Sequence, residues 1–136
     1  MKSKLLFTFL LLICVSVTFS QATSPLVGTW KLISGKINIG DSTFPYDNKS
    51  LDAIKIVTPT HFAVLAQNLS DTVFQHANAG TVKMDDKTYT EMILYGNGKT
   101  MIGKSAVFAY TLKGDRWSLK GSINEMKFEE EWQRVK

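Results

Sequence analysis

Cysteine is nearly absent from this sequence, and its single copy, Cys14, lies inside the leading apolar run. The rest of the chain therefore offers no disulfide, no thiol nucleophile and no cysteine-based metal site. Histidine is almost as rare, and His61 and His76 lack the i+2 or i+4 spacing of paired metal ligands. We therefore predict no metal and no cofactor, and we expect both histidines to be surface or wall residues of their strands.

A large excess of charge of one sign is also missing. The formal net charge is +4 at pH 7, and it falls to +2 without Lys2 and Lys4. So small a value argues against a strongly basic nucleic-acid binder, and we expect no nucleic-acid partner. The 136 residues are enough for one domain with one core.

The apolar run Leu5–Val17 is about thirteen residues long, whereas a membrane-spanning helix needs ~20. Two lysines precede this run, and small residues follow it at the positions typical of signal-peptide cleavage. We predict a signal peptide over residues 1–20, cleaved near Ser20 or Ala22, and a domain over residues 21–136. The protein is then secreted or periplasmic, and it has no stable membrane span once the signal is removed.

Helical periodicity is missing as well, and short runs of β-branched and aromatic residues alternate with turn signals instead. Asn97-Gly98 is the strongest hairpin signal, and the polar stretch Asp41–Asp52, which contains Pro45, indicates a loop. The pattern predicts an all-β fold, an antiparallel up-and-down β-barrel of about eight to ten strands. The expected strands are Leu26–Ile39, Ala53–Val57, His61–Gln67, Val73–Lys83, Thr88–Tyr95, Met101–Leu112, Arg116–Lys120 and Glu125–Val135.

The two ends of the domain carry a resemblance to a known superfamily. Gly28-Thr29-Trp30 stands near the start, and Trp132-Gln133-Arg134-Val135 stands at the end. Together they resemble the first and last strands of the calycins, which include lipocalins and fatty-acid-binding proteins. The second half of the chain, with Gly114-Asp115-Arg116-Trp117, is similar to small secreted lipocalin-like proteins of bacteria. The chain is shorter than a typical eukaryotic lipocalin, and it lacks the usual disulfide.

The resemblance implies a barrel whose end is closed by Gly28, Trp30 and Arg134. The physical reason is independent of the family, because a guanidinium can stack on an indole face while its N–H groups donate to backbone carbonyls. First and last strands are neighbours in a closed barrel, so Trp30 and Arg134 are expected to meet. We expect a structural role for all three residues.

The resemblance also implies a pocket for one small hydrophobic ligand. Strand alternation places Glu130 on the face of Trp132 and Arg134, and an inward carboxylate needs a partner such as Arg116 or a water-filled pocket. A bulge that turns Glu130 to solvent is the alternative. The candidate ligand-binding residues are Phe62, Val64, Phe74, Ile93, Tyr95, Phe108, Tyr110, Trp117 and Glu130.

Two functions remain open on the sequence. The first is an exported, non-enzymatic binding protein with a hollow barrel that takes a small, mostly apolar molecule. The second is a protein-interaction or inhibitory barrel with a packed interior, acting through the loops Asp41–Asp52 and Asn68–Val73. No nucleophile-elbow sequence is present, and we expect no enzymatic activity.

Overall fold

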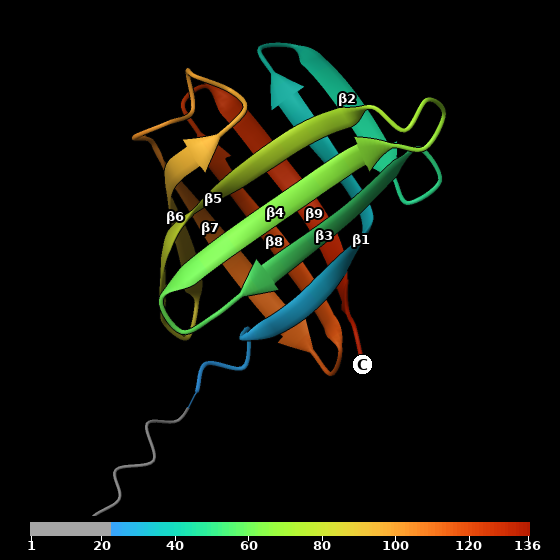
Figure 1. The fold of residues 1–136 in the computed structure, drawn as a ribbon. Coiled ribbons are helices and arrows are strands. Elements are labelled where there is room, and N and C mark those ends of the chain that lie inside the picture. Colours follow the sequence, from blue (N-terminus) through green and yellow to red (C-terminus); the bar gives the residue numbers. More distant parts are fainter. Residues whose placement is uncertain (1–22) are drawn as a thin grey trace, which may run out of the picture.

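The computed structural model describes residues 23–136, and these residues form nine β-strands without a helix (Figure 1). The predicted signal peptide lies outside the described residues. The strands are β1 (Gly28–Ile39), β2 (Ser42–Asp47), β3 (Leu51–Val57), β4 (His61–Asn68), β5 (Phe74–Met84), β6 (Thr88–Gly96), β7 (Ser105–Lys113), β8 (Arg116–Ile123) and β9 (Met126–Arg134).

Strand β1 closes the sheet into a barrel. From β3 to β9 each strand pairs antiparallel with the next along the chain, and β9 pairs back onto β1 from Arg134 opposite Trp30 to Met126 opposite Ile39. On its other edge, β1 pairs with β3 over Gly28–Lys31 and with β2 from Ser34 to Ile39. The result is an eight-stranded barrel of β1 and β3–β9, with β2 as an additional edge strand. The predicted fold class is confirmed.

Aromatic side chains close the end of the barrel that carries the C terminus. Trp30, Trp117 and Tyr89 are fully buried, and Trp117 meets the other two rings edge to face at centroid distances of 5.2 and 4.9 Å. Such edge-to-face pairs are preferred because the positive edge of one ring meets the negative face of the next. The indole N–H of Trp30 donates to the carbonyl of Leu26 at 2.9 Å, which fixes the entering chain beneath the stack.

Arg134 lies outside this aromatic layer and covers it. Its guanidinium carbon is 4.1 Å from the ring centroid of Trp30, and it donates to the carbonyls of Val27 and Pro25 at 3.0 and 2.5 Å. Gly28 has a φ of 144°, and a Cβ there would approach Nη1 of Arg134 to 2.6 Å. Glycine at this position therefore provides both the backbone conformation and the space that the stacked guanidinium occupies.

The predicted loop Asp41–Asp52 is wrong in part, because Ser42–Asp47 forms strand β2. Pro45 is tolerated there because β2 is an edge strand, with β1 on one side and no strand on the other. The backbone N–H that proline lacks is therefore not needed for pairing with a second strand. A hydrogen-bonded turn at Asp47–Ser50 then leads into β3.

The hairpin expected at Asn97-Gly98 is also wrong in detail. Strand β6 ends at Gly96 and β7 begins at Ser105, so residues 97–104 form a longer loop, and Met101 lies in that loop rather than in a strand. The Asn97 side chain accepts from the amide of Ala77 and donates to the carbonyl of Gln75. The asparagine therefore ties the loop to β5 rather than forming a two-residue turn.

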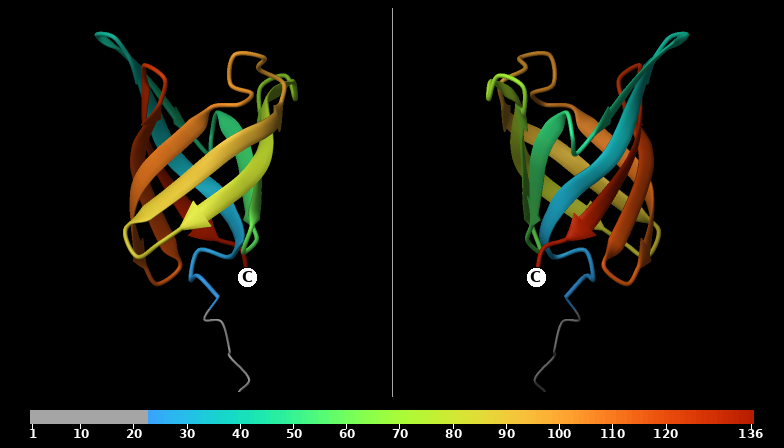
Figure 2. Two further views of the ribbon diagram at one scale, coloured as in Figure 1. Left: turned by 90° about the vertical axis from the view of Figure 1, so that its left-hand side faces the viewer. Right: turned by 90° about the vertical axis from the view of Figure 1, so that its right-hand side faces the viewer.

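The two ends of the barrel differ. At the end with the C terminus the turns are short, whereas the opposite end carries the 69–73 and 97–104 loops and the β1–β2 hairpin, which projects beyond the barrel (Figure 2). No helix that could cross a membrane occurs between residues 23 and 136.

Candidate functional site

A cavity of about 410 Å³ occupies the half of the barrel interior that faces away from Trp30. An eight-stranded barrel is just wide enough to be filled by side chains or to hold one small ligand, and this barrel is packed at one end and hollow at the other. The lining residues come from all nine strands and two adjoining loops. They are Leu32, Ile37, Tyr46, Ser50, Leu51, Ala53, Lys55, Val64, Ala66, Asn68, Gln75, His76, Asn78, Glu91, Ile93, Met101, Ala106, Phe108, Ile123, Phe128, Glu130 and Trp132.

Most of the cavity wall is apolar because alternate residues of each strand face inward. On β4, Phe62, Val64 and Ala66 are buried, whereas Leu65 between them is exposed. Small side chains such as Ala66 and Ala106 leave the space that larger residues fill at the closed end. An apolar wall with a few convergent polar groups is typical of sites for small molecules.

An ion pair crosses the floor of the cavity. Nζ of Lys55, on β3, is 3.0 Å from Oε1 of Glu91, on β6, and both side chains are less than one-tenth exposed. The same ammonium lies 5.0 Å from the ring centroid of Trp132 and 5.5 Å from those of Tyr89 and Trp117. The carboxylate and the ring faces together replace the water that the buried ammonium has lost.

Glu130 is the second acidic residue of the cavity, and it holds a different set of partners. Its Oε1 accepts from the hydroxyl of Tyr46 at 2.6 Å, and its Oε2 accepts from the indole N–H of Trp132 at 3.0 Å. Burial, and secondarily the charge of Glu130 and this hydrogen bond, raise the pKa of Tyr46. The hydroxyl therefore stays protonated and remains a donor. A Cβ at Gly35 would lie 2.4 Å from the Tyr46 ring, so glycine there admits the tyrosine.

His76 and Asn78 form the polar side of the cavity on β5. The side-chain amide of Asn78 lies 2.9 Å from Nε2 of His76. Burial is the main cause that lowers the pKa of His76, and the nearby charge of Lys55 acts in the same direction, whereas Glu130 and Glu91 oppose it. The imidazole is accordingly neutral near pH 7.

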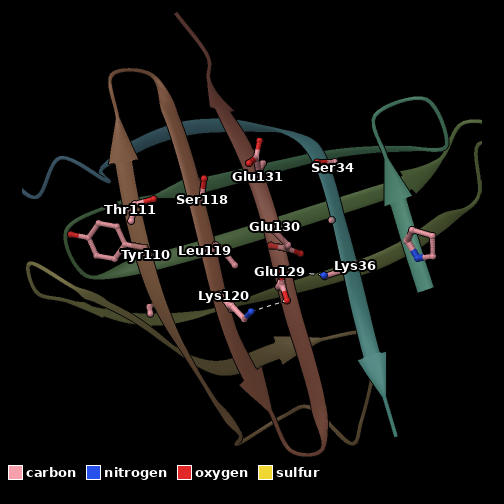
Figure 3. Close-up of a pocket in the computed structure, with 13 residues that line it drawn as sticks. Ser34, Lys36, Tyr110, Thr111, Ser118, Leu119, Lys120, Glu129, Glu130 and Glu131 are labelled. Carbon is pink, nitrogen blue, oxygen red and sulfur yellow. Dashed lines mark ion pairs between the residues drawn. The ribbon is translucent and has the colours of Figure 1, made fainter. Parts of the chain in front are cut away.

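A second hollow, of about 560 Å³, lies on the outside of the barrel (Figure 3). It is lined by residues of β1, β7, β8 and β9 and by Pro45 of β2. Glu129 binds both Lys120, at 2.9 Å, and Lys36, at 3.2 Å, across this groove, as the dashed lines of Figure 3 show. These two lysines lower the pKa of Glu129. The groove is open, and Glu129, Lys36 and Lys120 already pair with one another there, so the interior cavity is the better candidate site.

The structure divides eight of the nine predicted ligand-binding residues into three groups. Four of them line the cavity, and these are Val64, Ile93, Phe108 and Glu130. Phe62 and Trp117 are buried in the core without lining the cavity. Phe74 and Tyr95 are 52% and 70% exposed, and so they lie outside the interior.

Tyr110 and Arg116 also differ from the sequence-based interpretation. Tyr110 is half-buried at the closed end, its hydroxyl donates to the carbonyl of Asp85 at 2.8 Å, and it borders the outer groove. Arg116 pairs on the outside with Glu131 at 3.1 Å and does not meet Glu130. Glu130 does face inward, but its partners are Tyr46 and Trp132. The cation of the interior is Lys55, paired with Glu91.

Lys55 and Tyr46 were not predicted as site residues. Alternation offers a signal for Lys55, which shares a face with Ala53 and Val57, both buried. Tyr46 belongs to the segment interpreted as a loop, so its inward position had no signal. Among residues 23–136 no group of three or more His, Cys, Asp or Glu side chains is arranged to hold a metal ion.

The sequence matches no family model and no curated protein. A solved structure that resembles this chain is that of an uncharacterised protein from Bacteroides eggerthii DSM 20697. Its sequence identity is 14% and the TM-score is 0.48, over 80% of this chain and 98% of that chain.

Proposed function

We propose that this protein is an exported, lipocalin-like protein that binds a small, mostly apolar molecule without transforming it. The observation that carries the proposal is the cavity of about 410 Å³ inside the barrel. This volume falls within the ~300–1,000 Å³ typical of ligand pockets. This hollow interior favours a binding protein over the protein-interaction alternative, for which we expected a packed interior.

A pair of alanines on β4 provides the test. Ala66 lines the cavity, whereas Ala63 alternates with it on the outer face. Ala66→Phe should fill part of the cavity and weaken binding of 1-octanol, read from the intrinsic tryptophan fluorescence, to which Trp132 in the cavity wall contributes. Ala63→Phe, with the same added volume outside, should bind as the unchanged protein does. Equal weakening of octanol binding by both variants would reject a ligand cavity.

Native mass spectrometry of the protein from its own host would complement this experiment. A bound apolar molecule that is absent from the Ala66→Phe variant would support the proposal. The mass of the secreted chain would test export, since cleavage after Ser20 or Ala22 predicts two distinct N termini.

A further inference from the structure

The charged groups of the cavity are not balanced. The lining includes one cation, Lys55, and two carboxylates, Glu91 and Glu130, which leaves a net charge of −1 while His76 is neutral. We propose that the ligand is an apolar molecule bearing a protonated amine, and that its ammonium group is held by Glu130. This inference rests on the proposed function and names the chemical class of the ligand.

Lys55 does not offer a free site for an anion. Its ammonium is paired with Glu91 at 3.0 Å and lies 5.0 to 5.8 Å from the centroids of four aromatic rings. The two charges of this buried pair already neutralise each other, so an incoming carboxylate would have to share the ammonium with Glu91. It would also add a third negative charge beside Glu91 and Glu130, and like charges at short range in a low dielectric strongly disfavour one another.

Glu130, by contrast, has no cation paired with it among residues 23–136. Its neighbours along β9, Glu129 and Glu131, pair with Lys36, Lys120 and Arg116 on the outer face. Glu130 receives two hydrogen bonds from neutral donors, one on each oxygen. A carboxylate has about four acceptor positions, so each oxygen can accept a further bond.

Tyr46 and Trp132 also hold this carboxylate in position. They come from β2 and from β9 itself, and each fixes one oxygen of Glu130. The carboxylate is half-buried, so it is partly desolvated and yet reaches the cavity. An ammonium in such a place forms a charge-assisted hydrogen bond, which is about twice as strong as a neutral one.

The rest of the cavity suits the apolar part of such a ligand. Val64, Ile93 and Phe108 project into the same space from three other strands. His76 stays neutral near pH 7 and does not take the place of the ligand's cation. A chain or ring system with one amine at its end would therefore satisfy the wall and the carboxylate together.

Three octyl compounds with one chain and different head groups test this inference. At pH ~7.5 octylamine is a cation and octanoate an anion, since alkylammonium groups titrate near ~10.4 and carboxyls near ~4.3, whereas 1-octanol is neutral. Binding to the mature protein would be measured by isothermal titration calorimetry, below the concentration at which the compounds form micelles. We expect octylamine to bind at least about tenfold more tightly than 1-octanol, and octanoate to bind most weakly.

Two matched variants assign the preference to Glu130. Glu130→Gln should weaken octylamine binding by about tenfold and leave 1-octanol within about twofold, because only the charged hydrogen bond is lost. Glu131→Gln removes the same charge from the outer face of the neighbouring position, and should leave the order of affinities unchanged. Tyr46→Phe keeps the carboxylate, so it should keep the preference for the amine even if Glu130→Gln folds poorly.

The outcomes separate this inference from the proposed function. Octanol and octylamine bound equally well, with Glu130→Gln changing neither, would overturn the amine inference and leave the apolar binding function standing. Tightest binding of octanoate would overturn it in the same way. Failure of all three compounds to bind, together with equal behaviour of Ala66→Phe and Ala63→Phe, would overturn both.

Discussion

Lys55 and Glu91, which are 36 residues apart in the sequence, form an ion pair across the barrel interior at 3.0 Å. Their strands, β3 and β6, are separated in the sheet by β4 and β5, so the contact runs through the interior and not along the wall. The pair sits between the aromatic layer at the closed end and the hollow at the other end. It therefore forms the boundary between the packed end of the barrel and the hollow end.

Glu91→Gln should lower the free energy of unfolding by about 3–5 kcal/mol, because it leaves the buried Lys55 ammonium without its carboxylate. Urea unfolding followed by tryptophan fluorescence would measure the loss. The double variant Lys55→Met/Glu91→Leu should recover most of it, since an apolar pair of similar volume avoids the desolvation of both charges. As a control, Arg116→Ala breaks an exposed pair and should cost no more than about 1 kcal/mol. A small effect of Glu91→Gln would mean that water reaches Lys55.

Arg134→Ala should lower the free energy of unfolding by about 2 kcal/mol. The variant loses the stacking on Trp30, worth ~0.5–2 kcal/mol, and two hydrogen bonds to backbone carbonyls, worth ~1 kcal/mol each, in part offset by water. Arg134→Lys should recover only part of the loss, because an ammonium lacks the flat face and the fork of donors. Thermal unfolding monitored by far-UV circular dichroism would rank the three proteins. Equal stability of the lysine variant and the unchanged protein would contradict the stacking argument.

Gly35→Ala should destabilise the protein by about 1–3 kcal/mol, because the added methyl group meets the ring of Tyr46. In a Tyr46→Ala background the same substitution should cost much less, since the ring is gone. A double-mutant cycle measured by urea unfolding gives the coupling between the two positions, for which residues in contact show ~0.5–3 kcal/mol. Additive effects of the two substitutions would show that the ring does not pack on Gly35 in solution.

Acidification should destabilise the protein in a window set by His76. Burial lowers the pKa of His76 in the folded state below its ordinary value of 6.5, so the unfolded chain binds a proton more readily. The contribution of His76 to the free energy of unfolding is then fully present above pH ~6.5. It is lost as the pH decreases toward the pKa of His76 in the folded state. His76→Gln should flatten the dependence of the urea midpoint between pH ~5 and ~7, and substitution of the exposed His61 should not. The pKa values of Asp85 and Glu129 are also lowered in the folded state. Their contributions to stability are lost at lower pH, as their carboxylates become protonated.

The sequence was most informative where one face of a strand is buried. Alternation and turn signals predicted the strands that carry Phe62, Phe108 and Trp132, and the barrel follows from their number and spacing. Strand β2 was missed because its residues are mainly polar and include Pro45, and it forms only because β1 offers a free edge. On β4 both faces are apolar in the sequence, so only the closed sheet decides that Val64 faces inward and Leu65 outward.

The ion pair at the floor of the cavity and the hydrogen bond from β2 to Glu130 could not be predicted from the sequence, because each joins residues that lie on different strands. Lys55 and Glu91 each interrupt an apolar face, which marks them as unusual, but their pairing requires knowing which strands oppose each other across the barrel. The partners of Glu130 likewise come from β2 and from β9 itself. The bulge in β1 between Leu32 and Ser34 sets Gly35 opposite Glu130. Such long-range geometry is fixed only when the barrel closes.

Closure has a consequence for how the polypeptide acquires its shape. Arg134 reaches back to the carbonyl of Val27, 107 positions earlier, and the whole of β9 lies against β1. The seam cannot be joined until β9 has been synthesised, so the earlier strands must remain an open sheet until then. Removal of β9 would expose the edges of β1 and β8 together, and the shortened chain should aggregate rather than fold.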